Sequence, residues 1–171
     1  MHFSFDFLKI KDFAKIQFRF INFTQNIVKI MANRTSIKIT SEKLNLQDCY
    51  NFVQDDSCGG ISLFVGTVRN TTQNRKVTLL DFSSYEPMAL KEMQKIADTI
   101  LEKFPVYKIV IHHAVGELQI GAVPVIIAVS SAHRKAAFEA CEYAIDTLKE
   151  TVPIWKKEHF EDGEVWVNSH P

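Results

Sequence analysis

The chain has few of the residues that define disulfide-stabilised or metal-binding proteins. Its three cysteines, Cys49, Cys58 and Cys141, include no C-x-x-C pair. This odd, scattered set forms no closed disulfide framework and has no zinc-ligand spacing. Unpaired thiols suit a reducing compartment, so we expect a cytoplasmic (cytosolic) protein. We also expect no metal and no resident cofactor. Small apolar residues flank Cys141 at helical spacing, which favours a buried helical residue over a nucleophile.

Long apolar runs and an excess of one charge are also missing. No stretch of 18 apolar residues occurs, so the sequence predicts no membrane span. Twenty basic residues balance twenty acidic ones, which argues against a general nucleic-acid binder. Residues 1–40 hold seven Lys or Arg against two Asp, and the rest of the chain holds 13 against 18. A cationic cluster in this mildly acidic body would therefore stand out.

The first 34 residues differ in composition from the rest. They hold seven of the 13 phenylalanines, interleaved with lysines. The segment has too little Arg and Ser for a transit peptide, and it lacks the apolar centre and cleavage site of a secretory signal. We expect residues 1–34 to be a dispensable, poorly ordered extension with Met31 as an alternative start; a targeting segment is the competing interpretation. Residues 35–171 are expected to form one domain, because a chain of this size buries one good core.

The hydrophobic periodicity predicts a two-layer α+β domain with a mostly antiparallel sheet and packed helices. Strands are expected at residues 36–40, 61–68, 77–84, 106–114, 123–130 and 164–167, and helices at 46–53, 85–104 and 133–150. The strand at 61–68 is mostly apolar and is expected to be central, and the next strand pairs with it if the polar loop between them is a hairpin. His112 and His113 alternate across their strand and cannot chelate one metal together. Asn45 and Ser131 are candidate helix caps.

The last predicted helix carries the expected site. His133 and Arg134 lie at its start, where the helix dipole disfavours cations, so an anion is expected between them. Lys149 lies in its last turn, and Pro153 forbids a further turn, so the chain is expected to fold back and bring Lys156 near Lys149. A lysine that is crowded by cations and partly desolvated suits general acid/base work or amine nucleophilicity.

The same residues also permit an ordinary structural interpretation. Lys149 paired with Asp146, and Lys156 paired with Glu158, would be solvated surface charges of small energetic effect. Arg69, at the end of a strand, would be solvated too. The residues alone leave both interpretations open and indicate an anion site of undefined use.

Five blocks in the right order make the chain resemble the large, catalytic subunit of molybdopterin synthase, across about residues 35–168. The blocks are FVGTVRN (64–70), SAHR (131–134), AFEA (137–140), DTLK (146–149) and PIWKKE (153–158). The resemblance implies an α/β-hammerhead fold. It also implies a heterotetramer in which two large subunits dimerise centrally and one small ubiquitin-like subunit binds at each end.

The resemblance further implies a sulfurtransferase of molybdenum cofactor biosynthesis. The family converts cyclic pyranopterin monophosphate to molybdopterin by inserting two sulfurs. These sulfurs arrive as a thiocarboxylate on the C-terminal Gly-Gly tail of the small sulfur-carrier subunit. No cysteine of this chain is then needed as a sulfur carrier.

The substrate-binding residues implied by the resemblance are Thr67, Val68, Arg69, His133, Arg134, Lys149, Lys156, Lys157 and Glu158. Lys149 and Lys156 are the catalytic candidates, one activating the thiocarboxylate carbonyl and the other moving protons at the carbon that gains sulfur. Arg69, His133 and Arg134 are the candidates for phosphate and pterin. The loop at 71–74 departs from the family, which usually has a histidine and a glycine there. A non-catalytic module that binds a partner's carboxylate tail, and a generic acyl or phosphate-ester transferase using Lys149, remain alternatives.

Overall fold

The structure is a computed structural model that describes Gln17 and residues 34–167, and the fold is given for residues 34–167. The predicted extension at residues 1–34 lies outside the described residues, apart from Gln17 and Arg34. Within the described part of the chain, no helix has both the length and the apolar character needed to cross a membrane.

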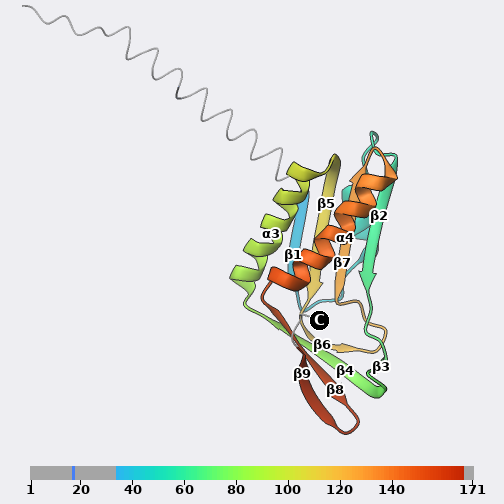
Figure 1. Ribbon diagram of the computed structural model, residues 1–171, viewed down its shortest axis with the longest axis vertical. Coiled ribbons are helices and arrows are strands. Elements are labelled where there is room, and N and C mark those ends of the chain that lie inside the picture. Colours follow the sequence, from blue (N-terminus) through green and yellow to red (C-terminus); the bar gives the residue numbers. More distant parts are fainter. Residues whose placement is uncertain (1–16, 18–33, 168–171) are drawn as a thin grey trace, which may run out of the picture. The chain divides into compact units, whose positions relative to one another are not determined.

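A four-stranded sheet forms the larger part of the fold (Figure 1). Its strands lie in the order β1 (Thr35–Thr40), β5 (Val106–Ala114), β7 (Val125–Ser131) and β2 (Gly60–Gly66). β1 pairs with β5 in parallel, and the other pairs are antiparallel. Every residue of β7 is buried, which fits a central strand rich in Val and Ile.

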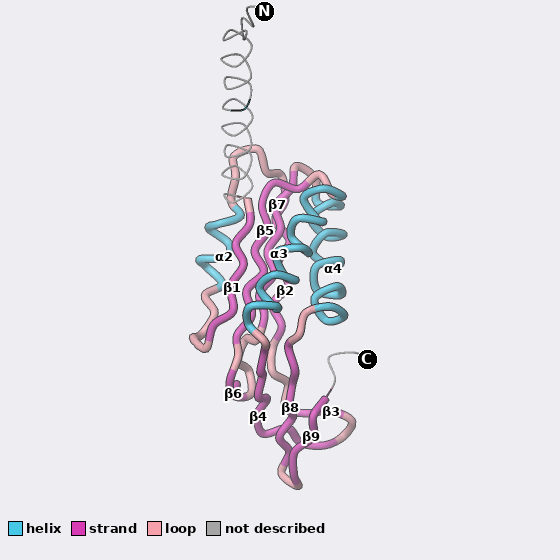
Figure 2. Tube along the Cα trace, turned by 90° about the vertical axis from the view of Figure 1, so that its left-hand side faces the viewer, coloured by secondary structure: helices cyan, strands magenta, loops and turns pink. Residues whose placement is uncertain are grey.

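Helices cover both faces of this sheet. α3 (Glu86–Lys103) and α4 (Arg134–Thr151) pack on one face, and the shorter α2 (Leu46–Val53) packs on the other (Figure 2). Two separate apolar clusters result, one beneath α3 and α4 and one beneath α2. The predicted α+β class is confirmed, and α2 adds a helix on the face opposite the two long helices.

A second sheet extends from one end of the first. It consists of β3 (Thr71–Thr72), β4 (Arg75–Ser84), β8 (Ile154–Phe160) and β9 (Gly163–Val167), with β6 (Gly116–Gln119) also paired to β4. β8 follows α4 directly, so the fold-back expected after Pro153 is a strand of this second sheet.

Local signals in the sequence were accurate where one residue type decides the structure. The Asn45 side chain caps α2 by accepting from the backbone N–H groups of Gln47 at 2.9 Å and Asp48 at 3.3 Å. β5 has the predicted bounds, and its two histidines face opposite sides of the sheet: His112 lies 3.3 Å from Cys49 Sγ on the α2 side, whereas His113 packs against Phe82.

Two predictions about strand pairing were wrong. β2 is an edge strand that pairs with β7 alone among the described strands; its apolar residues pack against α4, and Leu63 is 40% exposed. β4 does not pair with β2, because the hairpin at residues 71–76 joins β4 to the short β3 instead. Periodicity records how deeply a strand is buried but not which strands lie beside it.

The predicted cap of the last helix was also wrong. His133 occupies the N-cap position of α4 and makes no capping hydrogen bond with its side chain. The Ser131 hydroxyl is engaged elsewhere, donating to the carbonyl oxygen of Pro105 at 2.8 Å, and only a long 3.4 Å contact joins it to the His133 N–H.

The β3–β4 turn gives the first testable prediction. Its two central residues have left-handed backbone angles, φ 49° at Gln73 and 62° at Asn74, as in a type I′ hairpin. Gln73→Gly should raise the free energy of unfolding by about 0.5–1 kcal/mol, since glycine adopts positive φ without steric cost. Denaturant titration measures this change. Gln73→Val is the matched control and should destabilise; stabilisation by valine would contradict the turn geometry.

Candidate active site

A cavity of about 540 Å³ lies where the two sheets and the end of α4 meet. Apolar side chains form much of its wall, among them Phe64, Leu80, Phe82, Val125, Ile145, Leu148 and Ile154. Polar side chains from five separate stretches of the chain also line it: Thr67, Arg69, Thr72, His113, Lys149, Lys156 and Glu158. An apolar pocket with a few convergent polar groups is the usual form of a small-molecule site.

The end of α4 and the start of β8 place the two lysines. Lys149 lies in the last turn of α4, and the helix ends when the Val152 N–H donates to the Leu148 carbonyl at 3.1 Å. Pro153 follows and cannot donate a helical hydrogen bond, so the chain turns into β8. Both Lys149 and Lys156 consequently line the one cavity, as the fold-back prediction required.

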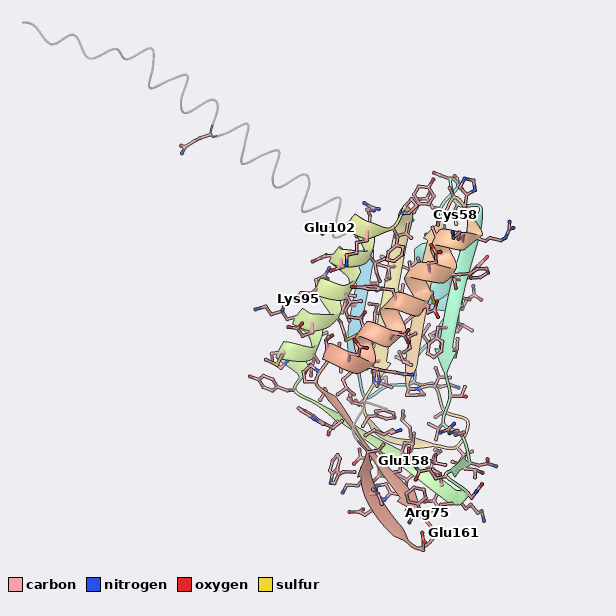
Figure 3. All side chains as sticks on the ribbon, in the orientation of Figure 1. Cys58, Arg75, Lys95, Glu102, Glu158 and Glu161 are labelled. Carbon is pink, nitrogen blue, oxygen red and sulfur yellow. The ribbon has the colours of Figure 1, made fainter. Side chains whose placement is uncertain are left out.

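Glu158 holds Lys156 in place. The two residues are two apart on β8, so their side chains share one face of the strand, and Lys156 Nζ lies 2.8 Å from Glu158 Oε1. The Glu158 side chain is only 3% exposed and that of Lys156 is 28% exposed. The solvated surface pair considered from sequence is therefore a largely enclosed ion pair. Glu158 Oε2 is sealed from solvent with no hydrogen-bond partner in the structure. Figure 3 shows Glu158 in the second sheet.

Val68 anchors the segment Thr67–Arg69, whose other two residues line the cavity. Val68 is 2% exposed; its N–H donates to the Ala122 carbonyl at 2.9 Å, and its own carbonyl accepts from the Gly121 N–H at 2.8 Å. Val68 is thus a buried anchor rather than part of the cavity wall. Thr67 and Arg69 are exposed residues that line the cavity on either side of it.

Three of the expected binding residues lie away from this cavity. His133 and Arg134 are exposed at the start of α4, whereas Lys149 is near its end. An 18-residue helix is about 27 Å long, so the two ends of α4 cannot contact one small molecule. Lys157 points to the other face of β8, with Nζ 3.0 Å from Glu164 and 4.7 Å from the centre of the Trp166 ring. Within one chain, three of the six expected cations, Arg69, Lys149 and Lys156, share the cavity, and the other three do not.

His113 was absent from the site expected from sequence, where it was considered only as a metal ligand. It is 4% exposed, lines the cavity, and packs edge-on against Phe82 with ring centres 5.2 Å apart. Burial lowers the pKa of His113 to about 4, although its hydrogen bond to the Ala114 carbonyl opposes that shift. The signal available in the sequence was strand alternation, which puts His113 on the face opposite His112.

The buried imidazole predicts a specific acid sensitivity. The pKa of His113 falls from 6.5 in the unfolded chain to about 4 in the folded protein, so the unfolded state binds the extra proton first as pH falls. Stability carried by the neutral ring is complete above pH 6.5 and declines towards pH 4, by roughly 3 kcal/mol.

Unfolding free energies of the wild type and His113→Gln between pH 7 and 4 measure this contribution. Both proteins keep the other charged side chains of the cavity, which are Arg69, Lys149, Lys156 and Glu158. The difference between the two proteins therefore reports on His113. The wild type should lose more stability than the variant over this interval. Equal losses would show that His113 is not held neutral by burial.

These features define a class of protein: an α+β domain with a cavity that is apolar in its wall and cationic at Arg69, Lys149 and Lys156. Such a site suits an anionic small molecule. Among the described residues, no group of three or more His, Cys, Asp or Glu side chains is arranged to hold a metal ion.

The comparisons with known proteins identify the family. Residues 39–151 match the MoaE protein family. The molybdopterin synthase catalytic subunit of Homo sapiens is 48% identical over 130 residues, which are 76% of this chain and 69% of that protein. The Dictyostelium discoideum subunit of the same name is 46% identical over 133 residues, 77% of this chain and 84% of its own. This chain belongs to the MoaE family, and the resemblance carried by the five sequence blocks is confirmed.

A solved structure agrees with this assignment. A crystal structure described as molybdopterin synthase from Staphylococcus aureus matches with a TM-score of 0.72 and 43% identity, covering 75% of this chain and 94% of that one. The fold around the cavity is therefore a family fold.

Proposed function

We propose that this chain is the catalytic subunit of a molybdopterin synthase and acts in molybdenum cofactor biosynthesis. As a sulfurtransferase, it would convert cyclic pyranopterin monophosphate to molybdopterin. The observation that carries the proposal is that Arg69, Lys149 and Lys156 line one cavity of about 540 Å³ together with an apolar wall. The cations suit the substrate phosphate, and the apolar surface suits a flat heterocycle.

The two lysines supply the chemistry in this proposal. One ammonium group polarises the carbonyl of the thiocarboxylate and stabilises the negative charge that develops on it. The other moves protons at the substrate carbon that gains sulfur. Lys156 is fixed by Glu158 at 2.8 Å, whereas Lys149 is exposed at the end of α4. Arg69, at the end of the segment that follows β2, is available for the phosphate.

The sulfur donor in this proposal is a small ubiquitin-like subunit whose C-terminal Gly-Gly tail carries the thiocarboxylate. A tail without side chains suits delivery into the cavity, because glycine allows the closest approach of a backbone. The three cysteines of this chain are free, and two of them, Cys49 and Cys141, are buried. Burial raises the pKa of both of these thiols, so neither suits the role of sulfur carrier. We propose that the protein acts in the cytosol.

We also propose that His133 and Arg134 serve a cavity in a second copy of the chain. The length of α4 keeps them from the cavity of their own chain. The family resemblance implies a central dimer of large subunits, and the proposal requires that this dimer bring the start of one α4 beside the cavity of its partner. Both residues are exposed and thus free to lie there.

Alanine variants of the lysines test the proposed chemistry. Lys149→Ala and Lys156→Ala should each lower the rate of dithiolene formation at saturating substrate by about 10²–10⁴-fold, the usual contribution of a proton-transfer or charge-stabilising group. The assay mixes the purified chain, cyclic pyranopterin monophosphate and thiocarboxylated small subunit. Lys95→Ala, an exposed α3 lysine paired with Glu92, is the matched control and should retain full activity. Full activity in both lysine variants would end the assignment.

The same assay separates the alternatives. A non-catalytic module would bind the small subunit but yield no dithiolene from the wild type. A generic transferase using Lys149 would act on the pterin phosphate without any thiocarboxylated partner. Dithiolene that forms only when both substrates are present supports the synthase.

Mixing two inactive variants tests the contribution of a second copy. His133→Ala and Lys149→Ala chains, unfolded and refolded together, should form mixed dimers. In each mixed dimer one of the two cavities is intact, because the His133→Ala chain keeps its own Lys149 and receives His133 from its partner. Random pairing then restores about a quarter of wild-type activity. Co-refolded Lys149→Ala and Lys156→Ala chains are the control, because both lesions lie in one cavity of the same chain. If His133→Ala alone is fully active, or if mixing restores nothing, the shared site is wrong.

A further inference from the structure

The ring of His113 is held in one orientation and one tautomer. Its Nδ1 atom lies 2.7 Å from the carbonyl oxygen of Ala114, and a carbonyl oxygen only accepts, so Nδ1 carries the hydrogen. The Phe82 ring packs edge-on against the imidazole and restricts its rotation. At neutral pH the ring is uncharged, because burial lowers its pKa to about 4. Nε2 therefore presents a lone pair and no hydrogen.

The lone pair of Nε2 is open to the cavity. No residue in the described ranges forms a hydrogen bond with it, and His113 is one of the cavity-lining residues. Of the unpartnered side-chain atoms in the described part of the chain, only Glu158 Oε2 and His159 Nε2 are sealed from solvent. His113 Nε2 is not among them, so it remains reachable from the cavity. An acceptor that is fixed in direction and faces a cavity can receive a hydrogen bond from a bound ligand without any rearrangement of the protein.

We propose that His113 Nε2 accepts a hydrogen bond from a ring N–H or amino group of the bound pterin, making His113 a specificity-determining residue of the cavity. The inference rests on the proposed function and deepens it. A reduced pterin carries several N–H donors, whereas its phosphate carries only acceptors under neutral conditions. The acceptor at His113 and the cations Arg69, Lys149 and Lys156 therefore recognise opposite ends of one substrate, and together they fix its direction in the cavity.

The expected selectivity follows from the missing hydrogen on Nε2. A heterocycle that offers only an acceptor at this position would place two lone pairs against each other. Sites built around a buried hydrogen-bonding group reject such analogues much more strongly than apolar pockets reject an altered shape. His113 thus favours a reduced ring that bears an N–H over an analogue in which the nitrogen that donates to Nε2 is methylated.

Two substitutions at His113 separate the acceptor from the rest of the ring. In His113→Asn the amide nitrogen takes the place of Nδ1 and keeps the bond to Ala114, but nothing replaces Nε2. In His113→Gln the amide reaches the place of Nε2, where its oxygen accepts. His112→Asn is the matched control on the same strand, because His112 faces α2 and contacts Ser36 and Cys49.

The experiment measures the dissociation constant of cyclic pyranopterin monophosphate for each full-length protein by isothermal titration calorimetry. His113→Asn should bind about 10- to 100-fold more weakly, and His113→Gln should recover most of that loss. His112→Asn should bind like the wild type. Inorganic phosphate, which probes the cations alone, should bind all four proteins equally.

The N-methylated pterin phosphate supplies a test on the wild type itself. It should bind the wild type about 10- to 100-fold more weakly than the parent compound, and His113→Asn should no longer distinguish the two compounds. If the wild type binds the parent compound and His113→Asn binds it equally well, His113 has no role in recognition. If the wild type binds no pterin phosphate at all, it is the proposed function that fails. If His113→Asn does not fold, the preference of the wild type between the two compounds decides the inference.

Discussion

Pro153 is the constraint on which the site depends. It lacks the N–H that another turn of α4 would require, and it forces the preceding Val152 into an extended backbone, φ −83° and ψ 126°. The helix therefore stops immediately after the turn that carries Lys149. The Pro153 carbonyl accepts from the Tyr85 N–H at 3.3 Å, which ties this break to the start of α3. A helix that continued would carry Lys156 away with the helix axis, and the cavity would lose one wall.

The second requirement is a carboxylate kept out of water. Burying Glu158 costs free energy that a single ion pair with Lys156 offsets only in part, since Oε2 has no partner. A solvated pair would cost less desolvation free energy but would leave the Lys156 ammonium group free to sample many positions. The buried carboxylate therefore fixes the position of the Lys156 ammonium group at the cavity.

The sequence predicted what single residues decide. Asn45 as a cap, Pro153 as a break and the alternation of His112 and His113 each follow from local chemistry, and the structure agrees. Partners in the sheets were less predictable, because an apolar run such as β2 is compatible with an edge strand that packs against a helix. Of the residues expected at the site, Arg69, Lys149 and Lys156 line the cavity together, and His113, which also lines it, was not expected there. The expected site also grouped residues at the two ends of one helix, since motif matching carries no distances.

The direction of the strands explains why those particular residues meet. β2 and β5 are both antiparallel to β7, so they run the same way and their C-terminal ends lie at the same end of the sheet. Arg69, which follows β2, and His113, near the end of β5, therefore lie at this end of the sheet. α4 follows β7 and packs back along it, so Lys149 lies at the same end of the sheet. His133 follows the far end of β7 and is necessarily remote. One chain of this topology can therefore bring an acceptor and several cations to a single cavity, but it cannot bring both ends of α4 there.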